Sequence, residues 1–95
     1  GTVHRLSRYR GQVVLLEFML TTCPHCQQTA KLLSRLEKEC GPKGFRAVSI
    51  AFNEDAFHAL PAFVKNHQVT HLVGALPRDA VYAFAALSAV VRHSV

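Results

Sequence analysis

Two cysteines, Cys23 and Cys26, are separated by a proline and a histidine and follow an apolar stretch that ends in two threonines. Three residues apart across the first turn of a helix, two sulfurs can face each other and close a small ring. The first sulfur then lies near unpaired backbone N–H groups and the positive end of the helix dipole, which favour a thiolate over a thiol. Pro24 suits the first helical position, where its missing N–H costs little. The pattern therefore predicts redox chemistry or metal binding at this turn.

The cysteine turn needs a strand before it and a helix after it. Residues 12–20, with the sequence QVVLLEFML, are nearly continuously apolar, which is typical of a central strand covered on both faces. From Cys23 to Cys40 the apolar residues recur three and four apart, which predicts a helix with one buried stripe. The stripe consists of Ala30, Leu33, Leu36 and Cys40. Gly41 followed by Pro42 predicts the end of this helix, with a left-handed cap residue and then a residue that cannot continue it.

A second strand is expected at residues 45–52, with the sequence FRAVSIAF. Two strands joined by a helix of this length form a βαβ unit, so they should be parallel with a right-handed crossover. The next helix should run from about Asp55 to about His67, with a cap offered by residues 53–55. Pro61 interrupts its pattern, and we expect the helix to be kinked or restarted there.

The two ends of the sequence give weaker patterns. Residues 1–11 are polar and basic and are expected to form a lead-in arm or a short turn. Residues 69–76 should be a short extended or irregular piece. Asp79 can cap a third helix over residues 80–87, and residues 90–95 are too short to classify. The residues of that helix expected to point inward are Val81, Phe84 and Leu87.

Composition limits the chain to one domain of 95 residues, and a hydrophobic content of 49% indicates a packed core rather than disorder. The formal charge of +5 comes from basic residues that are spread along the chain, apart from a group near its start. Only one aromatic residue lies in that group, so nucleic-acid binding is not expected. The sequence has no apolar run near 18 residues, which predicts no membrane span, and no signal-peptide pattern. It opens with Gly-Thr rather than Met, which suggests a processed piece, so the absence of a leader decides little about location.

The order strand, C-x-x-C, helix, strand, helix resembles the thioredoxin superfamily, in particular the extracytoplasmic TlpA/ResA-like thiol–disulfide oxidoreductases. The resemblance is carried by residues 11–33, GQVVLLEFMLTTCPHCQQTAKLL, and the Pro-His dipeptide is the one found in DsbA-type oxidants. It implies an α/β thioredoxin-like βαβ fold with central parallel strands and flanking helices. It also implies disulfide exchange with protein substrates and a redox partner protein, without a cofactor. The location it implies is extracytoplasmic, either periplasmic or anchored through a removed leader, with cytoplasmic as the alternative.

The residues of the motif can then be given roles. Cys23 is expected to attack a substrate disulfide and form a mixed disulfide, which Cys26 would resolve. His25 would favour the Cys23 thiolate as a cation or N–H donor, or else be a spectator on a solvent-facing turn. Glu17 lies six residues before Cys23, and the resemblance implies a buried acid that accepts the proton of the resolving cysteine. The alternative is that Glu17 faces a gap in the helix cover and meets water.

The sequence departs from the family pattern in two places. Thr22 stands where relatives usually have tryptophan, which alters the rim of the substrate groove. The resemblance also implies a cis-proline loop, a C-terminal β-hairpin and a final helix, but no proline occurs after Pro77. We therefore expect residues 1–95 to form a single, incomplete thioredoxin-like domain that lacks those elements. An incomplete sheet would leave an exposed edge, which predicts self-association or marginal stability.

Two other functions stay open. Cys23 and Cys26 could bind copper or zinc, although a closed zinc site needs four ligands and the remaining candidates are distant in sequence. The chain could instead be an inactive structural fragment. Cys40 is expected to be a small hydrophobic residue in the core rather than a redox partner. Surface or capping roles are expected for the scattered histidines, which are His4, His58, His67, His71 and His93.

Overall fold

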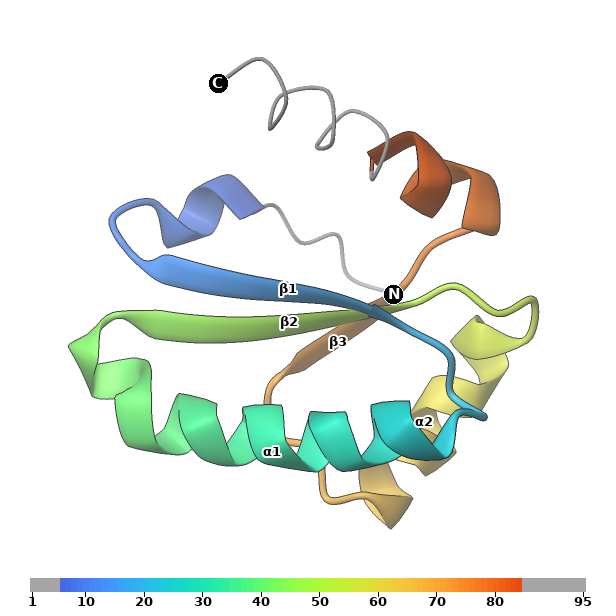
Figure 1. The fold of residues 1–95 in the computed structure, drawn as a ribbon, viewed down its shortest axis with the longest axis horizontal. Coiled ribbons are helices and arrows are strands. Elements are labelled where there is room, and N and C mark those ends of the chain that lie inside the picture. The colour runs from blue at the N-terminus through green and yellow to red at the C-terminus, as the bar shows by residue number, and fades with distance from the viewer. Residues whose placement is uncertain (1–5, 85–95) are drawn as a thin grey trace.

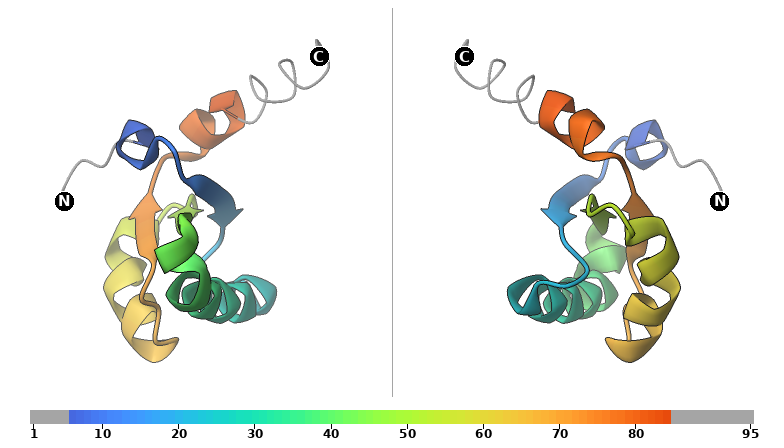
Figure 2. Two further views of the ribbon diagram at one scale, coloured as in Figure 1. Left: turned by 90° about the vertical axis from the view of Figure 1, so that its left-hand side faces the viewer. Right: turned by 90° about the vertical axis from the view of Figure 1, so that its right-hand side faces the viewer.

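A sheet of parallel strands lies between two layers of helix in the computed structural model, which describes residues 6–84 of the chain. Helices α1 (Pro24–Cys40) and α2 (Ala56–Asn66) cover one face of the sheet (Figure 1). The short 3₁₀ turn η1 (Leu6–Tyr9) and a helical segment at residues 78–84 lie on the other side, as the turned views show (Figure 2). This arrangement confirms the predicted α/β thioredoxin-like class with flanking helices.

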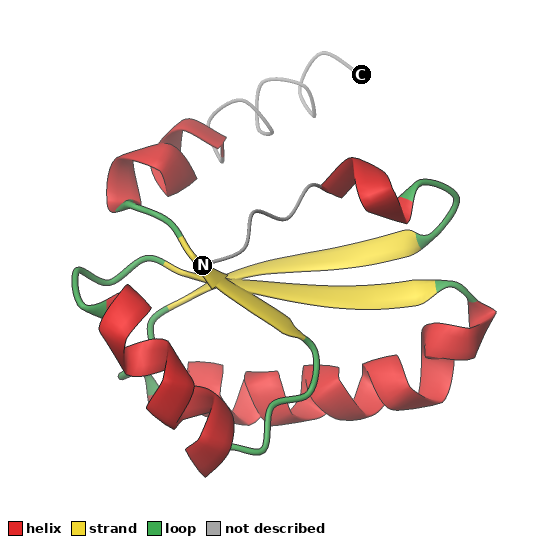
Figure 3. Cartoon of the chain, turned by 180° about the vertical axis from the view of Figure 1, so that it is seen from behind, coloured by secondary structure: helices red, strands yellow, loops and turns green. Residues whose placement is uncertain are grey.

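The sheet consists of β1 (Val13–Met19), β2 (Phe45–Ala51) and β3 (Leu72–Ala75), paired in that order and all parallel (Figure 3). The parallel pairing of the first two strands is as predicted. Among residues 6–84, however, β2 is the middle strand and β1 is an edge. Val13 is 69% exposed and Leu15 40% exposed, so the apolar run did not signal cover on both faces along its whole length.

The alternation of the strands assigns their side chains to the two faces. The face of β2 toward α1 and α2 carries Ala47, Ser49 and Ala51, which are at most 1% exposed. These small side chains let the helices approach the sheet closely. The buried core on this side consists of Met19, Ala30, Ala51, Ala56, Phe63 and Val69. Because Glu17 and Met19 are two residues apart, Glu17 lies on this face, under the helices.

The opposite face of the sheet packs against the helical segment 78–84. The ring of Phe18 meets that of Phe84 edge-on, with centroids 5.6 Å apart, and Val81 is buried. The segment begins before Asp79, so Asp79 lies within its first turn and does not cap it, contrary to the prediction. Leu87 and residues 90–95, for which we also made predictions, lie outside the described residues.

Helix α1 begins as predicted and ends differently. Cys23 is its N-cap and Pro24 its first residue, while Gly41 keeps a right-handed conformation with φ −54° and ψ −45°. The chain continues into the 3₁₀ turn η2 (Gly41–Lys43), where Pro42 is tolerated because a first-turn N–H has no partner to lose. The left-handed residue is Gly44, with φ 92°, three positions later than expected.

Helix α2 runs from Ala56 to Asn66 without a restart and contains Pro61 in its interior. The predicted cap is wrong in its chemistry, because the Asp55 side chain makes no capping hydrogen bond. The Ala56 N–H instead donates to the backbone oxygen of Asn53 at 3.0 Å. Among the helices of the described part of the chain, none has both the length and the apolar character needed to cross a membrane.

Candidate active site

The two cysteines lie at the junction of β1 and α1, where the chain turns back under the sheet. The turn is closed by the Cys23 N–H, which donates to the Leu20 carbonyl at 3.3 Å. Cys23 is extended, with φ −87° and ψ 119°, so its side chain caps the helix and its sulfur accepts the Cys26 N–H at 3.4 Å. Both cysteines are free thiols in this structure. The sulfur at the helix start is therefore where the sequence predicted it.

The environments of the two sulfurs make one more acidic than the other. A hydrogen bond from the Cys26 side chain, reinforced by the Cys26 backbone N–H, lowers the pKa of Cys23. Burial raises the pKa of Cys26, whose side chain packs against the apolar core. The negative charge of Glu17 opposes ionisation of both sulfurs. Cys23 is therefore the more readily ionised of the two thiols and the better nucleophile.

The turn before Cys23 is fixed by side chains that sequence reasoning did not single out. The Thr21 N–H donates to Asn53 Oδ1 at 3.1 Å, and Asn53 Nδ2 donates to Thr21 Oγ1 at 2.9 Å. Gln27 Nε2 donates to the Thr21 carbonyl at 3.1 Å from the first turn of α1. Thr21 is only 7% exposed, so these bonds satisfy a buried backbone. The polar pair that precedes the motif was visible in the sequence, but its partner after β2 was not.

Glu17 is partly buried on the helix-covered face of β1, close enough for its charge to act on both sulfurs. Burial raises the pKa of its carboxyl group, and a hydrogen bond from Ser49 opposes that rise. Ser49 lies directly beside Glu17 in the parallel register and donates to its Oε2 at 3.0 Å. The carboxyl group thus meets protein rather than only water on its strand side.

His71 is a candidate functional residue that sequence reasoning did not identify. It was expected at the surface or at a helix end, but it is 6% exposed, just before β3, and both ring nitrogens are engaged. Its Nε2 lies 2.8 Å from Ser49 Oγ, and its Nδ1 lies 2.6 Å from Ser34 Oγ on α1. A buried line of polar groups therefore extends from Glu17 through the middle strand to the helix. No sequence spacing connects these residues.

The remaining predicted residues lie on the accessible side of the turn or far from it. Pro24 and His25 are exposed on the first turn of α1. Cys40 is only partly buried and lies outside the core cluster, which corrects its predicted core role. It ends the helix that begins at the cysteine turn, 14 residues after Cys26, so it is roughly 21 Å from Cys26 along the helix axis, too far for exchange with it.

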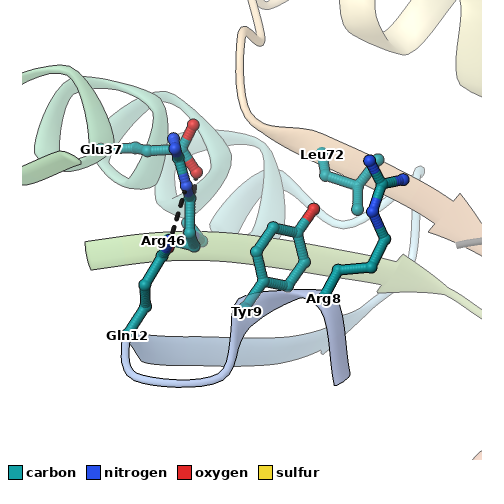
Figure 4. Close-up of a pocket in the computed structure, with 7 residues that line it drawn as sticks. Arg8, Tyr9, Gln12, Glu37, Arg46 and Leu72 are labelled. Carbon is teal, nitrogen blue, oxygen red and sulfur yellow. Dashed lines mark hydrogen bonds between the residues drawn. The ribbon is translucent and has the colours of Figure 1, made fainter. Parts of the chain in front are cut away.

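Among the hollows lined by described residues, two lie at opposite ends of the sheet. One of about 380 Å³ is at the amino ends of the strands, where Arg46 Nε donates to Gln12 Oε1 at 3.1 Å beside Tyr9 and Glu37 (Figure 4). The other, of about 550 Å³, is at the carboxyl ends and is lined mainly by apolar groups. Asn53, which holds the cysteine turn, is one of its walls. Only the second hollow adjoins the candidate site.

Metal binding has little support from the arrangement of ligands. Within residues 6–84, no group of three or more His, Cys, Asp or Glu side chains is placed to hold a metal ion. The cysteine pair alone offers two thiolates, whereas a closed zinc site takes four ligands.

Residues 1–86 match the family model described as Redoxin, and the chain belongs to this family. The fold is similar to that of a crystal structure from Chlorobium tepidum described as a candidate thiol:disulfide interchange protein, DsbE. The two share 25% sequence identity with a TM-score of 0.69 over 77% of this chain. The chain spans about half of that protein, 51% of its length. The comparison with curated proteins gave no match.

These comparisons confirm the predicted membership of the thioredoxin superfamily, with TlpA/ResA-like relatives. The family is one of thiol–disulfide oxidoreductases, in agreement with a cysteine pair placed at a helix start.

Proposed function

We propose that this chain exchanges disulfides with protein substrates through the dithiol of Cys23 and Cys26. The observation that carries the proposal is the unequal setting of the two sulfurs. Cys23 accepts hydrogen bonds from both the side chain and the backbone N–H of Cys26, whereas Cys26 is held against the core. A nucleophile and a protected second thiol are what a two-step exchange requires.

In the first step the Cys23 thiolate attacks one sulfur of a substrate disulfide. That disulfide breaks, a mixed disulfide with Cys23 forms, and the other substrate sulfur leaves as a thiolate. In the second step Cys26 gives up its proton to Glu17, and its thiolate attacks the Cys23 sulfur. The substrate leaves with both sulfurs reduced, and the pair Cys23–Cys26 has lost two electrons. The same steps in reverse oxidise a dithiol substrate.

The residues around the pair have supporting roles in this proposal. Pro24 suits the first position of the helix, where its missing N–H would have no partner, and its exposed position leaves Cys23 open to a substrate. The exposed imidazole of His25 provides a donor or cation beside the substrate-facing sulfur. Glu17 is the proton acceptor for Cys26, because it is the acid whose charge acts on both sulfurs. The hollow beside Asn53 offers an apolar surface for a substrate segment.

The wider setting follows the same family resemblance. We propose a single domain over residues 1–95, a redox partner protein that restores the pair, and an extracytoplasmic location. Because β1 and β3 are the edges of the described sheet, self-association through an edge belongs to the proposal. Light scattering of the purified chain tests this last point, and a strictly monomeric protein contradicts it.

The central test compares three cysteine variants in the reduction of a small disulfide-bonded protein. Cys23→Ser should abolish turnover and form no mixed disulfide, whereas Cys26→Ser should accumulate one. Cys40→Ser is the matched control and should keep the wild-type rate. Wild-type turnover by Cys23→Ser would refute the proposal. Metal analysis of the reduced protein should find no stoichiometric copper or zinc, and equilibration with a glutathione buffer gives the direction of electron flow.

A further inference from the structure

A continuous hydrogen-bonded line connects the proposed proton acceptor to the inside of α1. Ser49 Oγ donates to Glu17 Oε2 at 3.0 Å and is 2.8 Å from His71 Nε2. His71 Nδ1 is 2.6 Å from Ser34 Oγ, which accepts the Thr70 N–H at 2.9 Å. Ser34, Ser49 and His71 are all at most 6% exposed. Buried polar groups in such a line depend on one another's orientation.

The donors in this line can be assigned by counting hydrogens. A serine hydroxyl has one proton, and that of Ser49 is directed at Glu17. The Nε2 of His71 must therefore carry a hydrogen and donate it to Ser49, which leaves Nδ1 to accept the Ser34 hydroxyl. Every group is satisfied when His71 is neutral in this tautomer. A proton added at Nδ1 would displace the Ser34 donation and leave that hydroxyl to find another acceptor.

We propose that His71 is a positioning residue for the disulfide exchange, because it holds the Ser49 hydroxyl toward Glu17 and thereby sets how readily Glu17 accepts the Cys26 proton. This inference rests on the proposed function and adds a residue to it. His71 touches neither sulfur nor substrate, so it acts only through Ser49. Ser49 is central because it is fully buried on the middle strand and hydrogen-bonds both Glu17 on β1 and His71 just before β3.

The charged groups around the line determine the direction of the effect. Two groups act on Glu17 or are acted on by it: the hydroxyl of Ser49 on β2 and the two sulfurs at the start of α1. His71 faces Glu37 on α1, whose charge raises the pKa of the imidazole, but burial is the larger influence and lowers it, so the ring stays neutral. If His71 no longer holds Ser49, burial acts on Glu17 with less opposition. The carboxylate then forms only at higher pH, and release of the mixed disulfide slows near neutral pH.

Two substitutions of His71 separate the two ring nitrogens. The amide of glutamine reaches the position of Nε2, so His71→Gln keeps a donor for Ser49. The shorter His71→Asn reaches only the position of Nδ1 and loses that donor. Both remove the imidazole and enlarge the space in the core, so a purely packing role predicts similar effects for both. The same change at an exposed histidine, His58→Asn, is the control.

The primary readout is the titration of the Glu17 carboxyl carbon by NMR in the reduced protein, which needs no turnover. We expect His71→Asn to move the Glu17 midpoint to higher pH and His71→Gln to leave it close to wild type. Release of the mixed disulfide near pH 7 should slow about tenfold in His71→Asn, part of the ~10²–10⁴-fold that a positioned base contributes. The rate should recover at high pH. Equal Glu17 midpoints in both variants and wild type would overturn the inference.

Ser34→Ala keeps the test decisive if neither histidine variant folds. It removes the donor to Nδ1 on the far side of the ring and does not touch Glu17 or Ser49. The same upward shift of the Glu17 titration is expected, because the tautomer of His71 is no longer fixed, and an unchanged titration would count against the inference. The proposed function has a separate test: it fails if Cys23→Ser still turns over substrate, whatever the titration of Glu17 shows.

Discussion

Replacing Asn53 by alanine should loosen the turn that presents Cys23. Asn53 is the partner of both the Thr21 N–H, at 3.1 Å, and the Thr21 hydroxyl, at 2.9 Å. In Asn53→Ala the Thr21 N–H is left buried without that acceptor, which costs about 1–3 kcal/mol. Loss of the hydroxyl bond adds about 1 kcal/mol. The hydrogen bond from Asn53 to Asp55 is exposed to solvent, so its loss should cost almost no stability. The expected loss in the free energy of unfolding is therefore about 2–4 kcal/mol.

Thr21→Val is the matched variant, because it removes only the hydroxyl and keeps the backbone bond to Asn53. It should cost about 1 kcal/mol. The double variant should cost about as much as Asn53→Ala alone, because the hydroxyl bond is then counted once. Urea unfolding of the reduced protein measures all three, provided that the slope with denaturant is unchanged. Such a cycle isolates the coupling between the two side chains.

The functional consequence is measured by alkylation of Cys23 across pH. A loosened turn should weaken the Cys26 N–H bond to the Cys23 sulfur, so the pKa of Cys23 should rise toward its ordinary value in Asn53→Ala. The alkylation rate near pH 7 should fall accordingly, and in Thr21→Val it should change less. If Asn53→Ala is no less stable than Thr21→Val, and the alkylation profiles coincide, the turn is not held in the way argued above.

Three further outcomes are expected. Glu17→Gln should become more stable relative to wild type as pH rises above 4.5. The pKa of Glu17 is raised in the folded protein, so the stability that its protonated form contributes to the wild type is lost as pH rises through the folded-state pKa. Equal pH dependence of the two proteins in urea unfolding would contradict this. Cys26→Ala removes the main donor to Cys23, so the midpoint of the alkylation profile should move to higher pH, and an unmoved midpoint would count against that hydrogen bond. Phe63→Ala in the core should lower the free energy of unfolding by about 3–5 kcal/mol, and Phe57→Ala, at a side chain that is 65% exposed, by only about 0.5 kcal/mol. Similar losses for the two variants in thermal unfolding would contradict the assignment of Phe63 to the core.

The sequence predicts best what depends on neighbouring residues. The positions of Cys23 and Pro24 at the start of α1 follow from capping preferences within one turn, and the structure confirms them. The course of α1 follows from its apolar period of three and four. The end of the helix was misplaced because Gly41 and Pro42 are also compatible with a 3₁₀ turn, and only Gly44 takes the left-handed conformation.

What the sequence does not predict are contacts across long separations. Thr21 and Asn53 are 32 residues apart, and Ser49 and His71 are 22 apart, so no local pattern connects either pair. The pairing of Glu17 with Ser49 could be obtained only after the register of the two strands was known. The position of β1 at the edge of the sheet formed by residues 6–84 is likewise a property of the sheet, since an apolar run looks the same in a middle strand as in a partly covered edge.

In the exchange that we propose, the position of Glu17 lets one acid serve the two thiols in sequence. Its charge opposes ionisation of Cys23, and the influence is mutual, so a Cys23 thiolate also opposes ionisation of Glu17. When Cys23 enters a mixed disulfide, its negative charge disappears and the repulsion is lifted. Glu17 can then become the carboxylate that Cys26 needs as proton acceptor, and the hydroxyl of Ser49 is already directed at it. In the exchange that we propose, ionisation of Glu17 is thus less favourable while Cys23 is the nucleophile and more favourable once Cys26 must become one, so a single partly buried carboxyl group couples the two steps.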